Sequence, residues 1–174
     1  FPDVSGVRDR AVNGFHPFAH PLCPGAGLYC VNPTPAQPNP MAQVVRLQAK
    51  ILQTRTIDTP QGVGYGALHN AKGGERIATL AAGYADGYPR SLSGVGDAYI
   101  GELRAPIVGR VSMDLITIDV THIPQERCRP GQLVDLIGPH NPVDDVAAKA
   151  GTIGYEMLTS LGQRYHRVYL GGGN

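Results

Sequence analysis

The stretch VVRLQAKI, residues 44–51, alternates between apolar and polar side chains. Its apolar members from Val45 to Ile51 occupy every second position, and Arg46, Gln48 and Lys50 lie between them. Successive side chains of a β-strand point to opposite faces, so one face of such a strand would be apolar and the other polar. The stretch therefore predicts a strand that is buried on one face only.

The same reasoning, extended along the chain, predicts a mainly β fold. Alternating or short apolar runs, separated by turn residues, predict further strands at residues 77–82, 97–100, 103–111, 115–120, 132–137 and 164–170. The second and third of these are expected to pair as a hairpin across Gly101 and Glu102. Strands at such short spacing are typical of a small β-barrel or β-sandwich-like domain.

Two short helices are expected near the C-terminus. Asn141 would cap the first helix, with Pro142 at its first helical position and Gly151 at its end. Thr152 would cap the second helix, which runs on to about Leu161. Both helices follow the predicted strands, apart from the last one.

The N-terminal part of the chain has no regular period. Prolines and glycines interrupt residues 1–24, and four prolines within residues 33–40 predict a stiff, extended connector. We therefore expect an irregular arm and Pro-rich linker at residues 1–40 and a β domain at residues 41–174.

A metal site in this arm is a weaker alternative. His16, His20 and Cys23 have a spacing that could seat a metal, but Pro17 would break a helix that aligned them. Ordinary loop residues are the favoured interpretation, and no metal is predicted.

Composition excludes several classes of function. The 174 residues carry a formal net charge of +1, which argues against a nucleic-acid partner or a charged membrane surface. No apolar run approaches the roughly 20 residues that span a bilayer, and the first residues lack the order of a signal peptide. Three cysteines without regular spacing favour reduced thiols. We therefore expect a cytoplasmic protein with no membrane partner.

Tyr65 is the first candidate for chemistry, because Gly64 and Gly66 flank it in the run GVGYGA, residues 62–67. Glycine on both sides permits positive φ and a close approach by another backbone or a ligand. A tight turn with a core tyrosine is the alternative, and these six residues alone favour it.

Three further segments accompany this run, namely GYADGYPR (83–90), PIVGRVSMD (106–114) and TIGYE (152–156). In this order the four segments resemble the C-terminal domain of alanine racemase, and the resemblance extends from about residue 25 to residue 170. It implies a mostly β domain that completes an active site across a homodimer. It also implies a pyridoxal 5'-phosphate cofactor held on a lysine of a barrel domain. Residues 1–40 would be a remnant of the end of that barrel domain.

The resemblance implies a role for each matching residue. Racemisation needs acid–base groups on both faces of Cα, and Tyr65 would act opposite the cofactor lysine. Met113 and Asp114 would line the substrate carboxylate pocket. The access channel would include Tyr84 and Arg90.

The cofactor phosphate would be bound by Tyr155 and by the backbone N–H groups of Gly25 and Ala26.

Ordinary structural roles are an alternative for most of these side chains taken singly. Tyr84 and Tyr88, in the run GYADGYPR, could brace a hairpin. Met113 could be a core residue, and Arg110 could be a charge at the end of a strand.

Two features depart from the family pattern. Cys23 stands where the family has an arginine that donates to the pyridine nitrogen, so the arm has either diverged or is not the native continuation of the domain, as after truncation or a frameshift. The family's cofactor-lysine run is absent, and Lys50, Lys72 and Lys149 do not resemble it. The sequence thus predicts part of an alanine racemase that supplies D-alanine for peptidoglycan and is inactive alone. A racemase of broader specificity and a silent β module for dimerisation or partner binding are the alternatives.

Overall fold

The computed structural model describes residues 28–29, 31–32, 39, 42–64 and 69–170. Its first strand, β1 (Leu47–Ile57), contains residues 47–51 of the alternating stretch. Leu47, Ala49 and Ile51 are buried and Lys50 is exposed, which confirms the half-buried strand.

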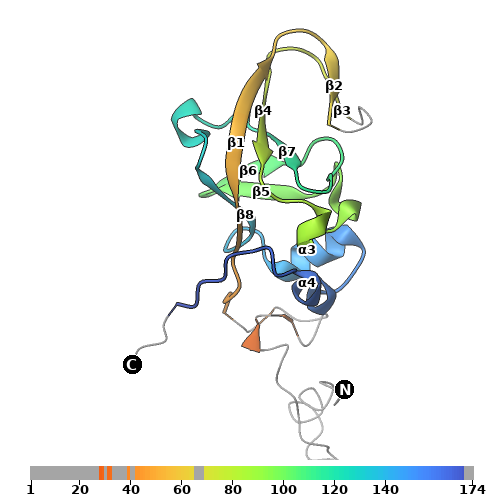
Figure 1. The fold of residues 1–174 in the computed structure, drawn as a ribbon, viewed down its shortest axis with the longest axis vertical. Helices are drawn as coiled ribbons and strands as arrows, with labels where there is room; N and C mark the ends of the chain where they lie inside the picture. The colour runs from red at the N-terminus through yellow and green to blue at the C-terminus, as the bar shows by residue number, and fades with distance from the viewer. Residues whose placement is uncertain (1–27, 30, 33–38, 40–41, 65–68, 171–174) are drawn as a thin grey trace, which may run out of the picture.

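The main sheet has six antiparallel strands in the order β6-β5-β8-β1-β4-β7. The strands other than β1 are β4 (Glu75–Leu80), β5 (Asp97–Ile100), β6 (Leu103–Pro106), β7 (Ile116–Asp119) and β8 (Leu133–Ile137). Ile107, which follows β6, forms an antiparallel bridge with Ile118 of β7, so the two edges of the sheet meet. The sheet is therefore an almost closed barrel, and the predicted mainly β fold is confirmed (Figure 1).

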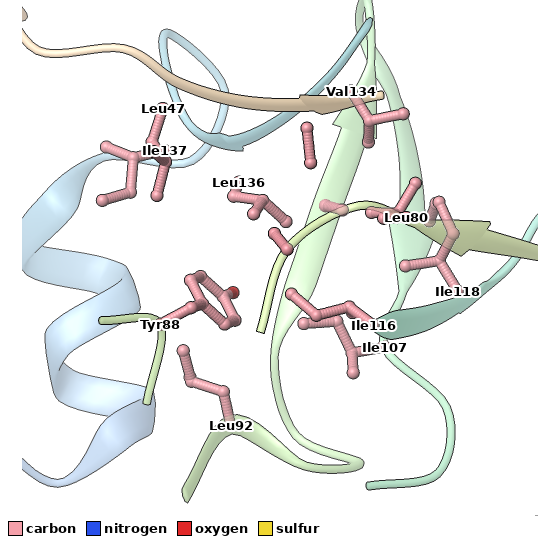
Figure 2. Packing of buried hydrophobic residues seen from close by; sticks show 14 of the residues in the cluster. Leu47, Leu80, Tyr88, Leu92, Ile107, Ile116, Ile118, Val134, Leu136 and Ile137 are labelled. Carbon is pink, nitrogen blue, oxygen red and sulfur yellow. The ribbon is translucent and has the colours of Figure 1, made fainter. Parts of the chain in front are cut away.

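The core fills this barrel and extends to the helices. Leu80, Ile116, Ile118 and Leu136 are completely buried and converge in the barrel interior (Figure 2). Tyr88 lies at the edge of the same cluster, and its burial raises the pKa of the phenol.

A second, smaller core lies outside the barrel, where β1 and β4 extend beyond it (Figure 1). Strands β2 (Gln61–Val63) and β3 (His69–Ala71) pair with each other and form a separate two-stranded sheet. The small core joins this sheet to the main one through Ile57, Val63, Ala71, Ile77 and Val108.

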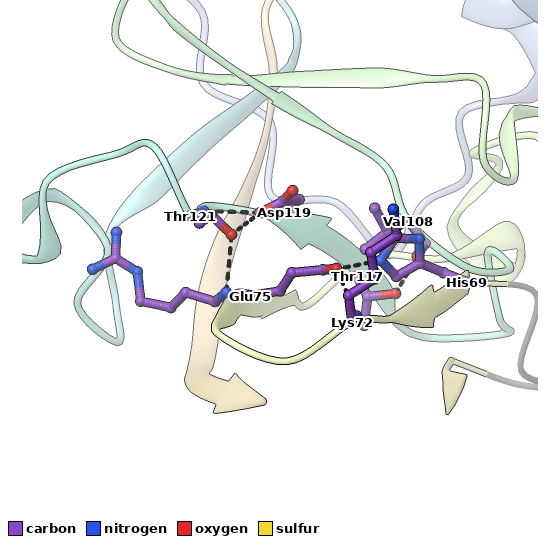
Figure 3. A network of polar contacts seen from close by, with 8 residues as sticks. His69, Lys72, Glu75, Val108, Thr117, Asp119 and Thr121 are labelled. Carbon is purple, nitrogen blue, oxygen red and sulfur yellow. Dashed lines mark hydrogen bonds and ion pairs between the residues drawn. The ribbon is translucent and has the colours of Figure 1, made fainter. Parts of the chain in front are cut away.

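Polar contacts hold the turn between β3 and β4 (Figure 3). His69 Nε2 lies 2.6 Å from Glu75 Oε2, and the Lys72 N–H donates to Glu75 Oε1 at 2.9 Å. These contacts lower the pKa of the Glu75 carboxyl, with the His69 contact as the larger cause. Nearby, the Thr117 hydroxyl donates to the Val108 carbonyl at 2.5 Å.

Two helices follow the sheet, as predicted, and pack together below it (Figure 1). They are α3 (Val143–Ala150) and α4 (Gly154–Ser160). Three single-turn 3₁₀ helices precede them, namely η1 (Tyr84–Asp86), η2 (Arg90–Leu92) and η3 (Gln125–Arg127).

The predicted N-terminal caps were wrong at both helices, whereas the predicted end of the first helix at Gly151 is confirmed. Pro142 is the N-cap of α3, and the buried Asn141 amide donates instead to the Asp97 and Leu136 carbonyls. Ile153 is the N-cap of α4, and the Thr152 hydroxyl donates to the Glu156 side chain, four residues on.

The predicted strand at residues 164–170 was also wrong. This segment is irregular, and Val168, Tyr169 and Leu170 are largely exposed. The physical reason is that β6 and β7, the outer strands of the sheet, already meet, so neither edge is open to a seventh partner.

No helix in the described ranges is long and apolar enough to cross a membrane. Of the three cysteines, Cys128 is buried and free, whereas Cys23 and Cys30 lie outside the described residues. The described residues also contain no cluster of three or more His, Cys, Asp or Glu side chains suited to a metal. His16 and His20 lie outside them.

Replacement of Leu136 by Ala should lower the free energy of unfolding by about 2–5 kcal/mol, because this side chain is completely buried and its loss leaves a cavity. Leu133→Ala, on the same strand but 44% exposed, is the matched control and should cost under about 1 kcal/mol. Urea denaturation measures both values. Equal losses would contradict the burial of Leu136 in the core.

Candidate active site

One pocket lies where the turn after β4 meets the loop before β7. Its volume is about 440 Å³. One side is formed by Tyr84 and Arg90, at the starts of η1 and η2. The other side consists of the consecutive residues 110–115, which lie between β6 and β7.

Gly83 allows these two sides to meet. The N–H groups of Tyr84 and Ala85 donate to the Ser112 and Met113 carbonyls, each at 3.0 Å. A Cβ at Gly83 would lie 2.3 Å from the Met113 carbonyl oxygen, which is closer than any side chain tolerates. The φ of Gly83 is −161°, so space and not backbone conformation requires glycine here.

Arginines set the charge of the pocket. Arg90 is exposed and Arg110 is half-buried, and neither forms an ion pair within the part of the chain that the structure describes. Asp114 is instead paired with Arg164, whose Nη2 lies 2.7 Å from Asp114 Oδ1. The two unpaired guanidinium groups therefore give the pocket a positive character, and their geometry suits a carboxylate or phosphate.

Gly64 brings the segment that leads into Tyr65 close to the loop between β6 and β7. A Cβ at Gly64 would lie 3.4 Å from both Gly109 Cα and the backbone nitrogen of Arg110. Gly64 and Gly109 have φ values of +76° and +74°, a left-handed conformation that glycine adopts without strain. Tyr65 itself lies outside the described residues, as do residues 66–68.

The structure thus brings together four of the residues singled out in the sequence: Tyr84, Arg90, Met113 and Asp114 all line the pocket. Tyr155 does not line it. Its side chain is half-buried on α4 and packs against the main core.

Gly25, Ala26 and Cys23 lie outside the described residues. Two further residues were given no site role from the sequence: Arg110, which was considered there only as a charge at the end of a strand, and Arg164. A signal for Arg110 was present, because it directly follows Gly109 in the segment that the family resemblance rests on. No sequence signal pointed to Arg164, because its contact with Asp114 spans 50 positions of the chain.

Comparison with known protein families identifies the family of the domain that contains this pocket. The family described as "Alanine racemase, C-terminal domain" matches residues 44–169. The chain belongs to the alanine racemase family. Its almost closed barrel with two helices is the C-terminal domain of that family.

Similar racemases come from several bacteria. An alanine racemase of Rhodospirillum rubrum is 54% identical over 148 residues, which cover 85% of this chain and 40% of the relative. A catabolic alanine racemase of Mesorhizobium japonicum is 52% identical over 149 residues, covering 86% and 39% of the two chains. The chain thus spans about 40% of the length of these racemases.

Solved alanine racemase structures share the fold. The Bartonella henselae enzyme, which carries covalently bound pyridoxal phosphate, gives a TM-score of 0.78 at 42% identity and covers 84% of this chain and 40% of its own. The Streptomyces coelicolor enzyme also gives a TM-score of 0.78, at 31% identity, with 86% and 40% coverage.

Gly83→Ala should disrupt the pocket, because the added methyl group would overlap the carbonyl oxygens of Ser112 and Met113. Forced overpacking of this kind costs about 1–3 kcal/mol. The expected result is a loss of stability of that size together with a large shift of the Met113 methyl NMR signal.

Gly162→Ala is the matched control. Its Cβ would make ordinary van der Waals contacts only, and the nearest atom would be the Asp86 carbonyl oxygen at 3.7 Å. Identical Met113 spectra for the two variants would contradict the close packing at Gly83.

Proposed function

We propose that this chain supplies the C-terminal part of a pyridoxal-phosphate-dependent alanine racemase, which interconverts L- and D-alanine. The observation that carries the proposal is the gathering of Tyr84, Arg90, Met113 and Asp114 around one pocket in a chain of this family. The rest of the enzyme would come from a barrel domain, and a homodimer in the cytoplasm is the expected assembly.

Charge and shape fit the pocket to the carboxylate of an amino acid. Arg90 and Arg110 offer guanidinium donors that no described carboxylate occupies. Met113 and Leu115 are 53% and 41% exposed on the same face. These apolar side chains would exclude water from a small substrate such as alanine once the barrel domain covered them.

Tyr65 is proposed as the acid–base group on one face of the substrate. Its phenolic oxygen would accept the Cα proton of L-alanine and return a proton on that face in the reverse direction. A phenol has an ordinary pKa of about 10, so a nearby cation or hydrogen-bond donor must stabilise its anion. The close approach of Gly64 to the Gly109 and Arg110 backbone supports this role, because Tyr65 follows Gly64 directly and Arg110 lines the pocket.

The donor chemistry of this chain fits part of the cofactor. Tyr155 presents a half-buried phenol on α4, and a phenol is a suitable donor to phosphate. Gly25 and Ala26 would add backbone N–H groups. When bound, pyridoxal phosphate would withdraw electrons from the Cα–H bond and so make its proton removable.

The lysine that binds the cofactor has to come from the barrel domain. Lys149 Nζ is held 2.5 Å from Asp97 Oδ2. Lys50 lies on β1 and Lys72 in the turn before β4, and neither lines the pocket.

The 174-residue chain alone should not racemise alanine, because it supplies only one of the two acid–base groups. It should be incubated with pyridoxal phosphate and L-alanine, and D-alanine measured by chiral chromatography. D-alanine above the level given by free cofactor would show that the chain carries a complete site.

Tyr65→Phe tests the acid–base role in a chimera in which residues 44–169 replace the matching segment of the Rhodospirillum rubrum racemase. Loss of the hydroxyl should lower racemisation in both directions by roughly 10² to 10⁴. Solvent deuterium should still enter Cα from D-alanine, whose proton the lysine removes, but not from L-alanine. Mass spectrometry measures both rates.

Tyr99→Phe is the control for this variant, because it removes a phenol hydroxyl from β5, where the ring stacks on His140 and does not line the pocket. Its rates should equal those of the unaltered chimera. An equal fall of exchange from both enantiomers in Tyr65→Phe, or no fall, would remove Tyr65 from the proposed role.

A further inference from the structure

Asp86 connects the pocket to the irregular C-terminal segment. It is 7% exposed, and its Oδ2 accepts the Gly83 N–H at 2.8 Å. Its backbone carbonyl accepts the Gly162 N–H at 3.0 Å. The segment after α4 is therefore fixed against the turn that forms one side of the pocket.

Arg164 of this segment bridges two carboxylates. Its Nε lies 3.2 Å from Asp86 Oδ1, and its Nη2 lies 2.7 Å from Asp114 Oδ1. Asp86 belongs to the turn on one side of the pocket and Asp114 lines the other side. One guanidinium thus joins the two sides, in addition to the backbone hydrogen bonds at Gly83.

The bridge also determines the charge that the pocket offers to a ligand. Asp114 shares the pocket with Arg90 and Arg110, which are unpaired among the described residues. Without a partner, the 52% exposed Asp114 carboxylate would be free to turn toward either of these guanidinium groups. It would then compete with any carboxylate ligand for them.

We propose that Arg164 is a positioning residue: it retains Asp114 at the rim of the pocket and so keeps Arg90 and Arg110 available to the substrate carboxylate. The proposal rests on the proposed function for the identity of that substrate. It concerns binding, because Arg164 acts through Asp114 and does not line the pocket.

The first test measures racemisation by the chimera described above. Arg164→Ala should raise the KM for alanine about three- to fivefold, the effect of one exposed charge pair, and leave kcat within about twofold. Arg164→Lys should recover part of the loss, because an ammonium keeps the charge but cannot bridge both carboxylates in the same geometry. In an Asp114→Asn background, Arg164→Ala should no longer raise KM.

Arg167→Ala is the matched control. Arg167 lies on the same segment but donates only to the Leu161 and Gly162 carbonyls. Its KM should equal that of the unaltered chimera. An unchanged KM in Arg164→Ala, or an equal rise in the Asp114→Asn background, would overturn the proposal.

The second test does not depend on racemisation. The 174-residue chain is titrated with acetate, a simple carboxylate, while NMR follows the Nε–Hε signals of Arg90 and Arg110. Both signals should shift, and Arg164→Ala should weaken the apparent affinity about three- to fivefold unless Asp114→Asn is also present.

The two tests separate the two ideas. A chimera without racemisation, together with the expected acetate results, would end the proposed function but support the role of Arg164. Equal acetate affinities in the unaltered chain and Arg164→Ala, or no shift of either signal, would overturn that role even if the chimera is active.

Discussion

The pocket depends on the absence of a side chain at Gly83. Two carbonyl oxygens of the loop before β7 occupy the space that a Cβ would need, and two successive N–H groups after Gly83 bind those same carbonyls. Because this close contact and its two hydrogen bonds hold the backbones together, the turn after β4 and the loop before β7 behave as one unit. Tyr84 and Met113 face the same pocket for this reason.

The barrel provides a rigid base, and the pocket lies where two cores meet. The main core fixes β4 and β7, the strands from which the two sides of the pocket extend. The small core fixes β2 and β3, and hence Gly64, against Val108 and Gly109. The segment that leads into Tyr65 is therefore placed by packing outside the barrel, beside a loop placed by packing within it (Figure 1).

Sequence reasoning succeeded where the signal was local. Period-two alternation located β1, because one face of that strand is buried along the part from Leu47 to Ile51. Four residues that line the pocket, namely Tyr84, Arg90, Met113 and Asp114, were singled out because they lie in short runs that resemble a known family. The same reasoning failed at residues 164–170, where the alternation is present but no sheet edge is open.

The remaining misses share a physical cause, which is tertiary contact. Asn141 has the residue type of a helix cap, yet its amide satisfies two buried carbonyls of neighbouring strands. Arg164 is an ordinary surface arginine in the sequence, and only the fold brings Asp86 and Asp114 to it. Neither outcome follows from local pattern, because each partner lies on a separate element.

The residues between β6 and β7 are proposed to form part of an amino-acid carboxylate site that a barrel domain completes. Propionate is alanine without its amino group, and it can be bound to crystals of the Rhodospirillum rubrum chimera. In that crystal structure the propionate carboxylate should lie against residues 110–114 of this domain. Propionate held only by barrel residues, with residues 110–114 out of contact, would contradict it.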